Sequence, residues 1–214
     1  MPGETRIVPF GGTAYSTGPR HTTNSPDFAH DIAFLVLDTD AMTERPGTRA
    51  LTAGDLDVGD LPMRQAANGF VGFPGSENRA LPGYTFLRSS FYYGGQAAGR
   101  DYYERLGYDP RTHFVMSFER ERMVERGGRI VAVPEPYGMS GGPVFTLGTF
   151  EEIDRQTARP RVIGLAIEWW QRLDVLVSVR VGLVTEALRQ LLPDLGTELP
   201  VAPHFQANVA LDEI

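Results

Sequence analysis

The sequence predicts an all-β protein that ends in a helix. Short runs rich in Val, Ile and Phe recur along the chain, each bounded by Gly, Pro, Asp or Asn, which is typical of strands separated by turns. The 24 glycines and 16 prolines are spread throughout, which favours many short elements over long helices. Residues 183–192 have apolar side chains at helical spacing, and Pro193 ends the stretch. Many strands followed by one terminal helix indicate a barrel or a sandwich.

The predicted strands follow one another along the whole chain up to the terminal helix. They span residues 6–10, 32–37, 69–73, 113–118, 130–133, 143–147, 162–169 and 175–181. Residues 125–129 predict a hairpin turn, because Gly127 and Gly128 are free to adopt positive φ. A second, weaker helix is predicted over residues 97–106. It lies next to several tyrosines in the irregular stretch 76–110, which is either a substrate-contacting insertion or a long loop packed by its aromatic rings.

Composition excludes several kinds of chemistry. The 214 residues can bury a sizeable core, and a net charge of −7 without a basic tract excludes a nucleic-acid or anionic-membrane surface. All 20 basic residues are Arg, so lysine Schiff bases, the phosphate-loop lysine and Ser–Lys dyads are excluded. The absence of Cys excludes disulfides, thiol nucleophiles and thiolate metal sites. No signal peptide or apolar membrane span is found, and we expect a cytoplasmic protein without a cofactor.

The sharpest chemical signal is the run Gly-Met-Ser-Gly-Gly-Pro at residues 138–143. Acyl transfer needs a serine hydroxyl on a tight turn, with backbone N–H groups directed at the oxygen that becomes an anion. Glycines allow such a turn and let a substrate approach the main chain. The run therefore predicts Ser140 as a nucleophile, with the N–H groups of Gly138 and Ser140 as the oxyanion hole. The alternative is a glycine-rich turn between two strands.

Several segments together resemble the trypsin-like serine peptidases, in particular bacterial members. Residues 138–145 and 162–167 resemble the nucleophile segment and the strand after it. Residues 31–37 resemble the strand headed by the triad aspartate, 69–75 resemble a glycine-rich strand ending between the barrels, and 183–192 match the C-terminal helix. The segments occur in the family's order over residues 6–192.

The resemblance implies two antiparallel β-barrels with the active site in the cleft between them. It assigns the triad acid to Asp31, and it gives Glu168 and Trp169 a place at the end of the strand that lines the substrate cleft. We expect a first, incomplete barrel over residues 1–75, an irregular insertion and hairpin over 76–128, a second barrel with the helix over 129–192, and a tail over 193–214.

The family's base is a histidine in a Thr-Ala-Ala-His-like context, and the sequence contains no such segment. In the chymotrypsin order the base precedes the acid by about 45 residues. A position about 45 residues before Asp31 would fall before Met1. We therefore expect the chain to begin inside the first barrel. His21, ten residues before Asp31, is the candidate substitute. His30 adjoins Asp31, and neighbours on a strand point to opposite faces, so that pair should not touch.

The remaining histidines offer no better base. His113 opens a predicted strand and is interpreted as structural, and His204 lies in the proline-rich tail. A metal site built from histidine and aspartate at positions 21, 27, 30 and 31 matches no known ligand spacing, so no metal is predicted.

The sequence thus predicts a serine endopeptidase-like protein that acts on a peptide or protein. One alternative is a non-catalytic trypsin-like module that binds peptides or acts as a scaffold. A second is an α/β-hydrolase, because Gly-x-Ser-x-Gly also occurs at residues 138–142, followed by Asp174 or Asp194 and then His204. That fold requires a helix after the serine turn, whereas residues 143–147 have the pattern of a strand, so we disfavour it.

Overall fold

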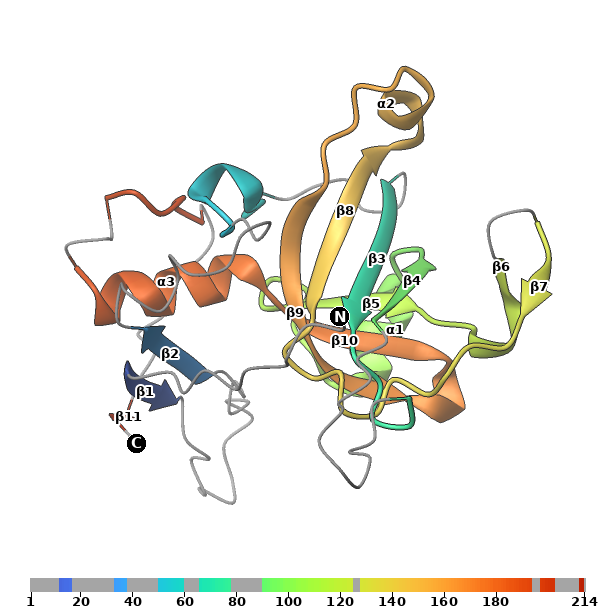
Figure 1. Cartoon of the computed structure of the whole chain (residues 1–214), viewed down its shortest axis with the longest axis horizontal. Coiled ribbons are helices and arrows are strands. Elements are labelled where there is room, and N and C mark those ends of the chain that lie inside the picture. The colour runs from blue at the N-terminus through green and yellow to red at the C-terminus, as the bar shows by residue number, and fades with distance from the viewer. Residues whose placement is uncertain are drawn as a thin grey trace, which may run out of the picture.

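The computed structural model describes residues 12–16, 33–37, 50–59, 66–77, 90–124, 128–193, 197–202 and 212–213. The described chain is mostly β, with few helices, as Figure 1 shows. This confirms the all-β fold class that the sequence predicts. Within these residues, no helix combines the length and apolar character needed to cross a bilayer.

Six antiparallel strands form the main sheet, in the order β4-β3-β8-β9-β10-β5. They are β3 (Ala66–Gly72), β4 (Phe91–Gly95), β5 (His113–Ser117), β8 (Pro143–Thr149), β9 (Arg161–Trp170) and β10 (Val175–Arg180). The sheet is curled, and β8 and β9 run side by side through its middle (Figure 1). Strand β8 returns over a long connection to lie beside β3 rather than beside β5, which is the arrangement of a Greek key.

The two edges of this sheet meet. Ala97, just after β4, forms an antiparallel bridge with Met116 of β5. The N–H of Ala98 donates to the Val115 carbonyl at 2.9 Å, and that of Ser117 donates to the Gln96 carbonyl at 2.8 Å. These bonds satisfy backbone groups that an open sheet would leave exposed at its edges.

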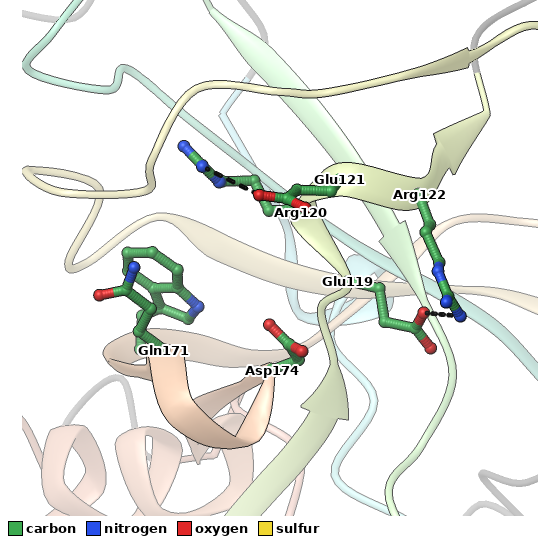
Figure 2. A pocket seen from close by; sticks show the side chains of 7 residues that line it. Glu119, Arg120, Glu121, Arg122, Gln171 and Asp174 are labelled. Carbon is green, nitrogen blue, oxygen red and sulfur yellow. Dashed lines mark hydrogen bonds and ion pairs between the residues drawn. The ribbon is translucent and has the colours of Figure 1, made fainter.

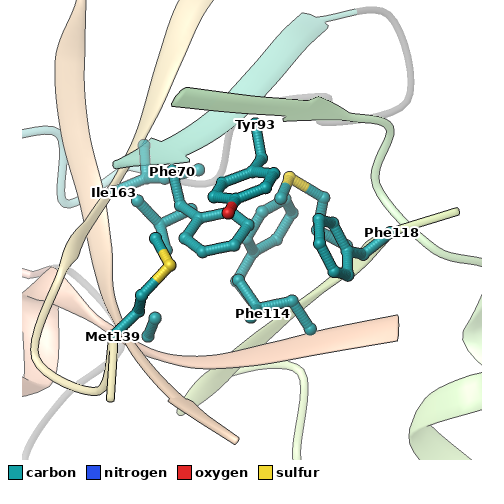
Figure 3. Close-up of a cluster of buried hydrophobic side chains, with 10 residues drawn as sticks. Phe70, Tyr93, Phe114, Phe118, Met139 and Ile163 are labelled. Atoms are coloured by element: carbon teal, nitrogen blue, oxygen red, sulfur yellow. The ribbon is translucent and has the colours of Figure 1, made fainter. Parts of the chain in front are cut away.

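Aromatic side chains fill the interior of the curled sheet (Figure 3). The Phe70 ring stacks on Tyr93 with centroids 4.8 Å apart and meets Phe118 edge-on at 5.5 Å. Phe114 and Ile163, from β5 and β9, belong to the same cluster. One core therefore joins strands from both halves of the described chain.

Two helices cover the outside of this sheet. The α3 helix (Val181–Leu191) follows β10 directly and places Leu183 and Val184 against Val179 and the partly buried Leu165. The α1 helix (Arg100–Leu106) packs Tyr103 on Val115, Val175 and Val177. The helix over 183–192 and the weaker one over 97–106 are thereby both confirmed, the former starting two residues earlier than predicted.

The other described elements are short. The hairpin strands β6 (Met123–Val124) and β7 (Ile130–Val131) pair with each other, on either side of the predicted turn. A second sheet has the order β11-β1-β2, from β1 (Gly12–Ser16), β2 (Ala33–Leu37) and β11 (Asp212–Glu213). The α2 helix (Phe150–Asp154) begins at a capping box in which Thr149 and Glu152 bond each other's backbone.

Strand pairing links segments on either side of residues 75 and 128, and the domain division expected there stays a prediction. Strand β3, expected at the end of the first barrel, pairs with β8. The expected insertion contributes β4, α1 and β5 to the same curled sheet. Strand pairing joins residues far apart in sequence, which local pattern does not report. The predicted strand over 6–10 lies outside the described residues.

The core predicts a clear contrast between two phenylalanines of one segment. Phe70 is fully buried, whereas Phe73 is 50% exposed. We expect Phe70→Ala to lower the free energy of unfolding by about 3–5 kcal/mol, because it leaves a cavity between two aromatic rings. Phe73→Ala should change it by about 0.5 kcal/mol or less. Urea denaturation measures both, and a similar cost for the two variants would contradict this assignment of the core.

Candidate active site

The residues that carry the predicted nucleophile form a tight turn that leads into β8. The Met139 N–H donates to the Pro136 carbonyl at 3.1 Å, and the Gly142 N–H donates to the Met139 carbonyl at 2.9 Å. The Met139 side chain is 3% exposed and belongs to the aromatic core. Because Met139 points inward, the next residue, Ser140, is exposed to solvent.

Backbone hydrogen bonds fasten this turn to β9 and to the end of β3. Ala166 of β9 accepts from the Gly141 N–H at 2.8 Å and donates to the Gly142 carbonyl at 2.9 Å. On the other side, the Gly75 N–H donates to the Tyr137 carbonyl at 2.8 Å. The turn is therefore held by β9 on one side and by the segment that follows β3 on the other.

The turn carries the kinds of group that acyl transfer requires, a serine hydroxyl and backbone N–H donors. The Ser140 Oγ–H donates to the Ile167 carbonyl over 3.4 Å, a long and weak hydrogen bond. The N–H groups of Gly138 and Ser140 donate no hydrogen bond within the part of the chain that the structure describes. Gly138 has φ +80°, a left-handed conformation that favours glycine. Two backbone donors are thus available beside an exposed hydroxyl.

A cavity of about 300 Å³ opens beside Ser140. It is lined by residues 136–140 of the turn, residues 166–169 of β9, and Leu176 of β10. Its walls are mostly apolar or aromatic, and Glu168 is the one charged residue among the described residues that line it. The structure therefore brings together Gly138, Ser140, Glu168 and Trp169, four of the residues that the sequence singles out.

Trp169 forms a wall between this cavity and a second hollow of about 580 Å³, because it lines both. Its ring meets Tyr137 at 5.5 Å and Phe118 at 6.1 Å, both edge-on. Figure 2 shows the second hollow, where charged side chains surround the opening. Two ion pairs neutralise most of this charge, Arg122 with Glu119 at 3.3 Å and Arg120 with Glu121 at 3.7 Å.

Glu168 has a hydrogen-bond partner that sequence analysis did not assign to the site. The Tyr108 hydroxyl donates to Oε2 of Glu168 at 2.6 Å. Burial raises the pKa of Tyr108 above its usual value, and the adjacent Glu168 raises it further. The Tyr108 ring lies 4.4 Å from that of His113, which is buried at 2% exposure and hydrogen-bonds Thr112 through Nδ1. The cluster of tyrosines in the irregular stretch was the sequence signal for Tyr108.

The other predicted site residues lie outside the described residues. These are the proposed acid Asp31 and the candidate base His21, together with Asp27, His30 and His204. The described residues contain no group of three or more His, Cys, Asp or Glu side chains that could hold a metal ion. The serine turn continues directly into strand β8, so it lacks the strand–turn–helix geometry of an α/β-hydrolase elbow.

Neither the protein-family models nor the curated proteins include a match to this chain. Fold and site by themselves define an all-β protein that displays a serine on a glycine-rich turn, beside an apolar cavity with a single carboxylate.

Two adjacent glycines of the turn test how tightly it is held. A Cβ on Gly142 would lie 2.5 Å from the Val71 carbonyl oxygen and 2.9 Å from that of Met139, whereas a Cβ on Gly141 meets nothing within 4 Å. We expect Gly142→Ala to cost about 3 kcal/mol of stability, because backbone must move. Gly141→Ala should cost about 1 kcal/mol, for its φ of +83° alone. Thermal and urea unfolding measure both costs, and equal costs would show that the turn yields easily.

Proposed function

We propose that this chain is a trypsin-like serine hydrolase of the endopeptidase type, with Ser140 as its nucleophile. The observation that carries the proposal is the exposed Ser140 at the mouth of a cavity, on a turn whose Gly138 and Ser140 N–H groups donate no hydrogen bond among the described residues. The curled antiparallel sheet, followed directly by α3, supports the trypsin-like resemblance of residues 66–192. A second barrel of the trypsin type, built from the N-terminal part, belongs to this proposal.

The proposed reaction is acyl transfer in two steps. Ser140 Oγ attacks the carbonyl carbon of the scissile amide while its proton passes to a general base, and the Gly138 and Ser140 N–H groups stabilise the oxyanion. The C–N bond then breaks as the base returns the proton to the leaving amine. Water, deprotonated by the same base, releases the peptide from the acyl-enzyme. Asp31 is the proposed acid that orients the base, and His21 is the candidate for the base within this sequence.

One observation favours a second candidate, a peptide-binding module without turnover. The Ser140 hydroxyl donates to the carbonyl of Ile167, and a serine is a weak nucleophile unless a positioned base accepts its proton. Such a module would use the same cavity and the same backbone donors to hold a peptide. Chemical reactivity of Ser140 distinguishes the two candidates.

Reaction with a fluorophosphonate tests Ser140 directly. We expect the intact protein to be labelled at Ser140, as located by mass spectrometry, because an activated serine beside two N–H donors attacks the phosphorus centre. Ser140→Ala should abolish labelling. Ser76→Ala, which removes another exposed serine of a turn, should leave the labelling rate unchanged. Labelling that survives Ser140→Ala would assign the nucleophile to another residue, and no labelling of the unmodified protein would favour the binding module.

The rate of peptide turnover tests the proposed acid, and the rate of fluorophosphonate labelling tests the proposed base. If Asp31 orients the base, Asp31→Asn should slow turnover by about 10⁴, whereas Asp40→Asn should have little effect. His21→Ala should slow labelling of Ser140 by several orders of magnitude, because a serine without a positioned base is a weak nucleophile. A tenfold loss or less in Asp31→Asn would remove Asp31 from the triad, and unchanged labelling of His21→Ala would assign the base to another group.

A further inference from the structure

The glycine-rich end of β3 and the residues after it lie against the turn that carries Ser140. Residues 69–75 stand out in the sequence for their glycines, and the proposed reaction assigns them no role. The Gly75 N–H donates to the Tyr137 carbonyl at 2.8 Å. A Cβ on Gly138 would lie 3.4 Å from the Gly75 nitrogen, so the two backbones approach closely there. This segment is therefore in direct contact with the turn.

Gly72, the last residue of β3, is covered by the side chain of Met139. A Cβ on Gly72 would lie 2.7 Å from Cε of Met139 and 3.1 Å from both its Cβ and its Cγ. Cε ends a flexible side chain and can move, but Cβ and Cγ lie next to the backbone of the turn. Both residues are buried, and Met139 extends into the aromatic core toward Ile163 (Figure 3). A side chain at position 72 would therefore push on the turn itself.

Met139 lies between the two proposed oxyanion donors, the N–H groups of Gly138 and Ser140. Neither N–H donates a hydrogen bond within the part of the chain that the structure describes, so their directions follow from the backbone of the turn. Met139 is buried, whereas the residues on either side of it are exposed. Its packing therefore holds the centre of the segment that carries both donors.

We propose that Gly72 and Met139 are positioning residues for the oxyanion hole. The absence of a side chain at position 72 lets Met139 enter the core, and this contact orients the two N–H groups. The proposal rests on the proposed function, because it gives those groups an oxyanion to stabilise. Side chains that are locked by packing keep a catalytic geometry in place, and a misplacement of about 1 Å costs roughly 10²-fold in rate.

Gly72→Ala and Gly94→Ala form a matched pair of variants. Gly94 is also a strand glycine of the main sheet, but the nearest atom to a Cβ there is the Asn68 carbonyl oxygen, 3.9 Å away. We expect Gly72→Ala to slow the maximal rate of fluorophosphonate labelling at Ser140 by about 10- to 100-fold. The concentration that gives half of that rate should stay the same, because the cavity side chains on β9 are not altered. Gly94→Ala should be labelled at the unmodified rate.

These rates are compared where urea denaturation shows each variant to be fully folded. A merely structural role for Gly72 would then leave the maximal rate unchanged. Met139→Ala removes Cγ and Cε, and it should slow labelling about as much as Gly72→Ala because the anchor of the turn is lost.

A double variant tests whether Gly72 acts through Met139. Because Met139→Ala makes room for the added methyl group, Gly72→Ala should slow labelling by less than about threefold in that background. Losses that multiply would overturn the proposal. The comparison of Met139→Ala with the double variant also serves if Gly72→Ala alone does not fold.

The backbone amide signals of Gly138 and Ser140 in heteronuclear NMR report on the turn whether or not the serine reacts. We expect both signals to shift in Gly72→Ala and to keep their positions in Gly94→Ala. Unmoved signals in Gly72→Ala would overturn the proposal. If the signals shift but the unmodified protein resists the fluorophosphonate, the positioning of the turn stands and the enzymatic function fails. If Ser140 is labelled equally fast with and without Gly72→Ala, the enzymatic function stands and the role of Gly72 fails.

Discussion

The reciprocal pair of hydrogen bonds between Ala166 and the turn is the constraint on which the site depends. Ala166 accepts from Gly141 and donates to Gly142, so the turn is joined to β9 before β8 has begun. The same ladder continues from Pro143, which lies opposite Leu165. The position of Ser140 is therefore set by backbone pairing, and the cavity beside it has one wall from each partner of that pairing.

The aromatic core extends this rigidity to the rim of the cavity. Trp169 meets Phe118, and Phe118 in turn meets Phe70 and Tyr93. The wall between the two hollows is thus the outer end of a chain of packed rings. Side chains locked by such packing hold a binding site in one geometry and lower the entropy lost when a ligand binds.

Local pattern was sufficient for most elements of the fold. The strands over 143–147, 162–169 and 175–181 are rich in Val, Ile and Leu, and the structure confirms them as parts of β8, β9 and β10. Strand β4 was missed because Phe-Tyr-Tyr-Gly-Gly has no apolar alternation and ends in two glycines. The α2 helix was missed although Thr149 and Glu152 form the Thr-x-x-Glu capping signature, which precedes only five helical residues.

Long-range relations were beyond what local pattern reports. Ser140, Gly138, Glu168 and Trp169 were identified from motifs and lie in one cavity, because backbone hydrogen bonds through Ala166 join residues 138–142 to β9. Tyr108 reaches the site across 60 residues, and no spacing rule connects it with Glu168. The same holds for β3, whose pairing with β8 crosses the boundary that the sequence indicated at residue 75.

The site divides its tasks between backbone and side chains. The proposed oxyanion donors are the N–H groups of Gly138 and Ser140, and their positions follow from the turn and its bonds to β9. The cavity beside them is lined by side chains that include Glu168 and Trp169 of β9, and Tyr108, after α1, donates a hydrogen bond to Glu168. Substitution of these side chains leaves the backbone ladder in place. The geometry of the turn and the lining of the cavity can therefore change independently of each other.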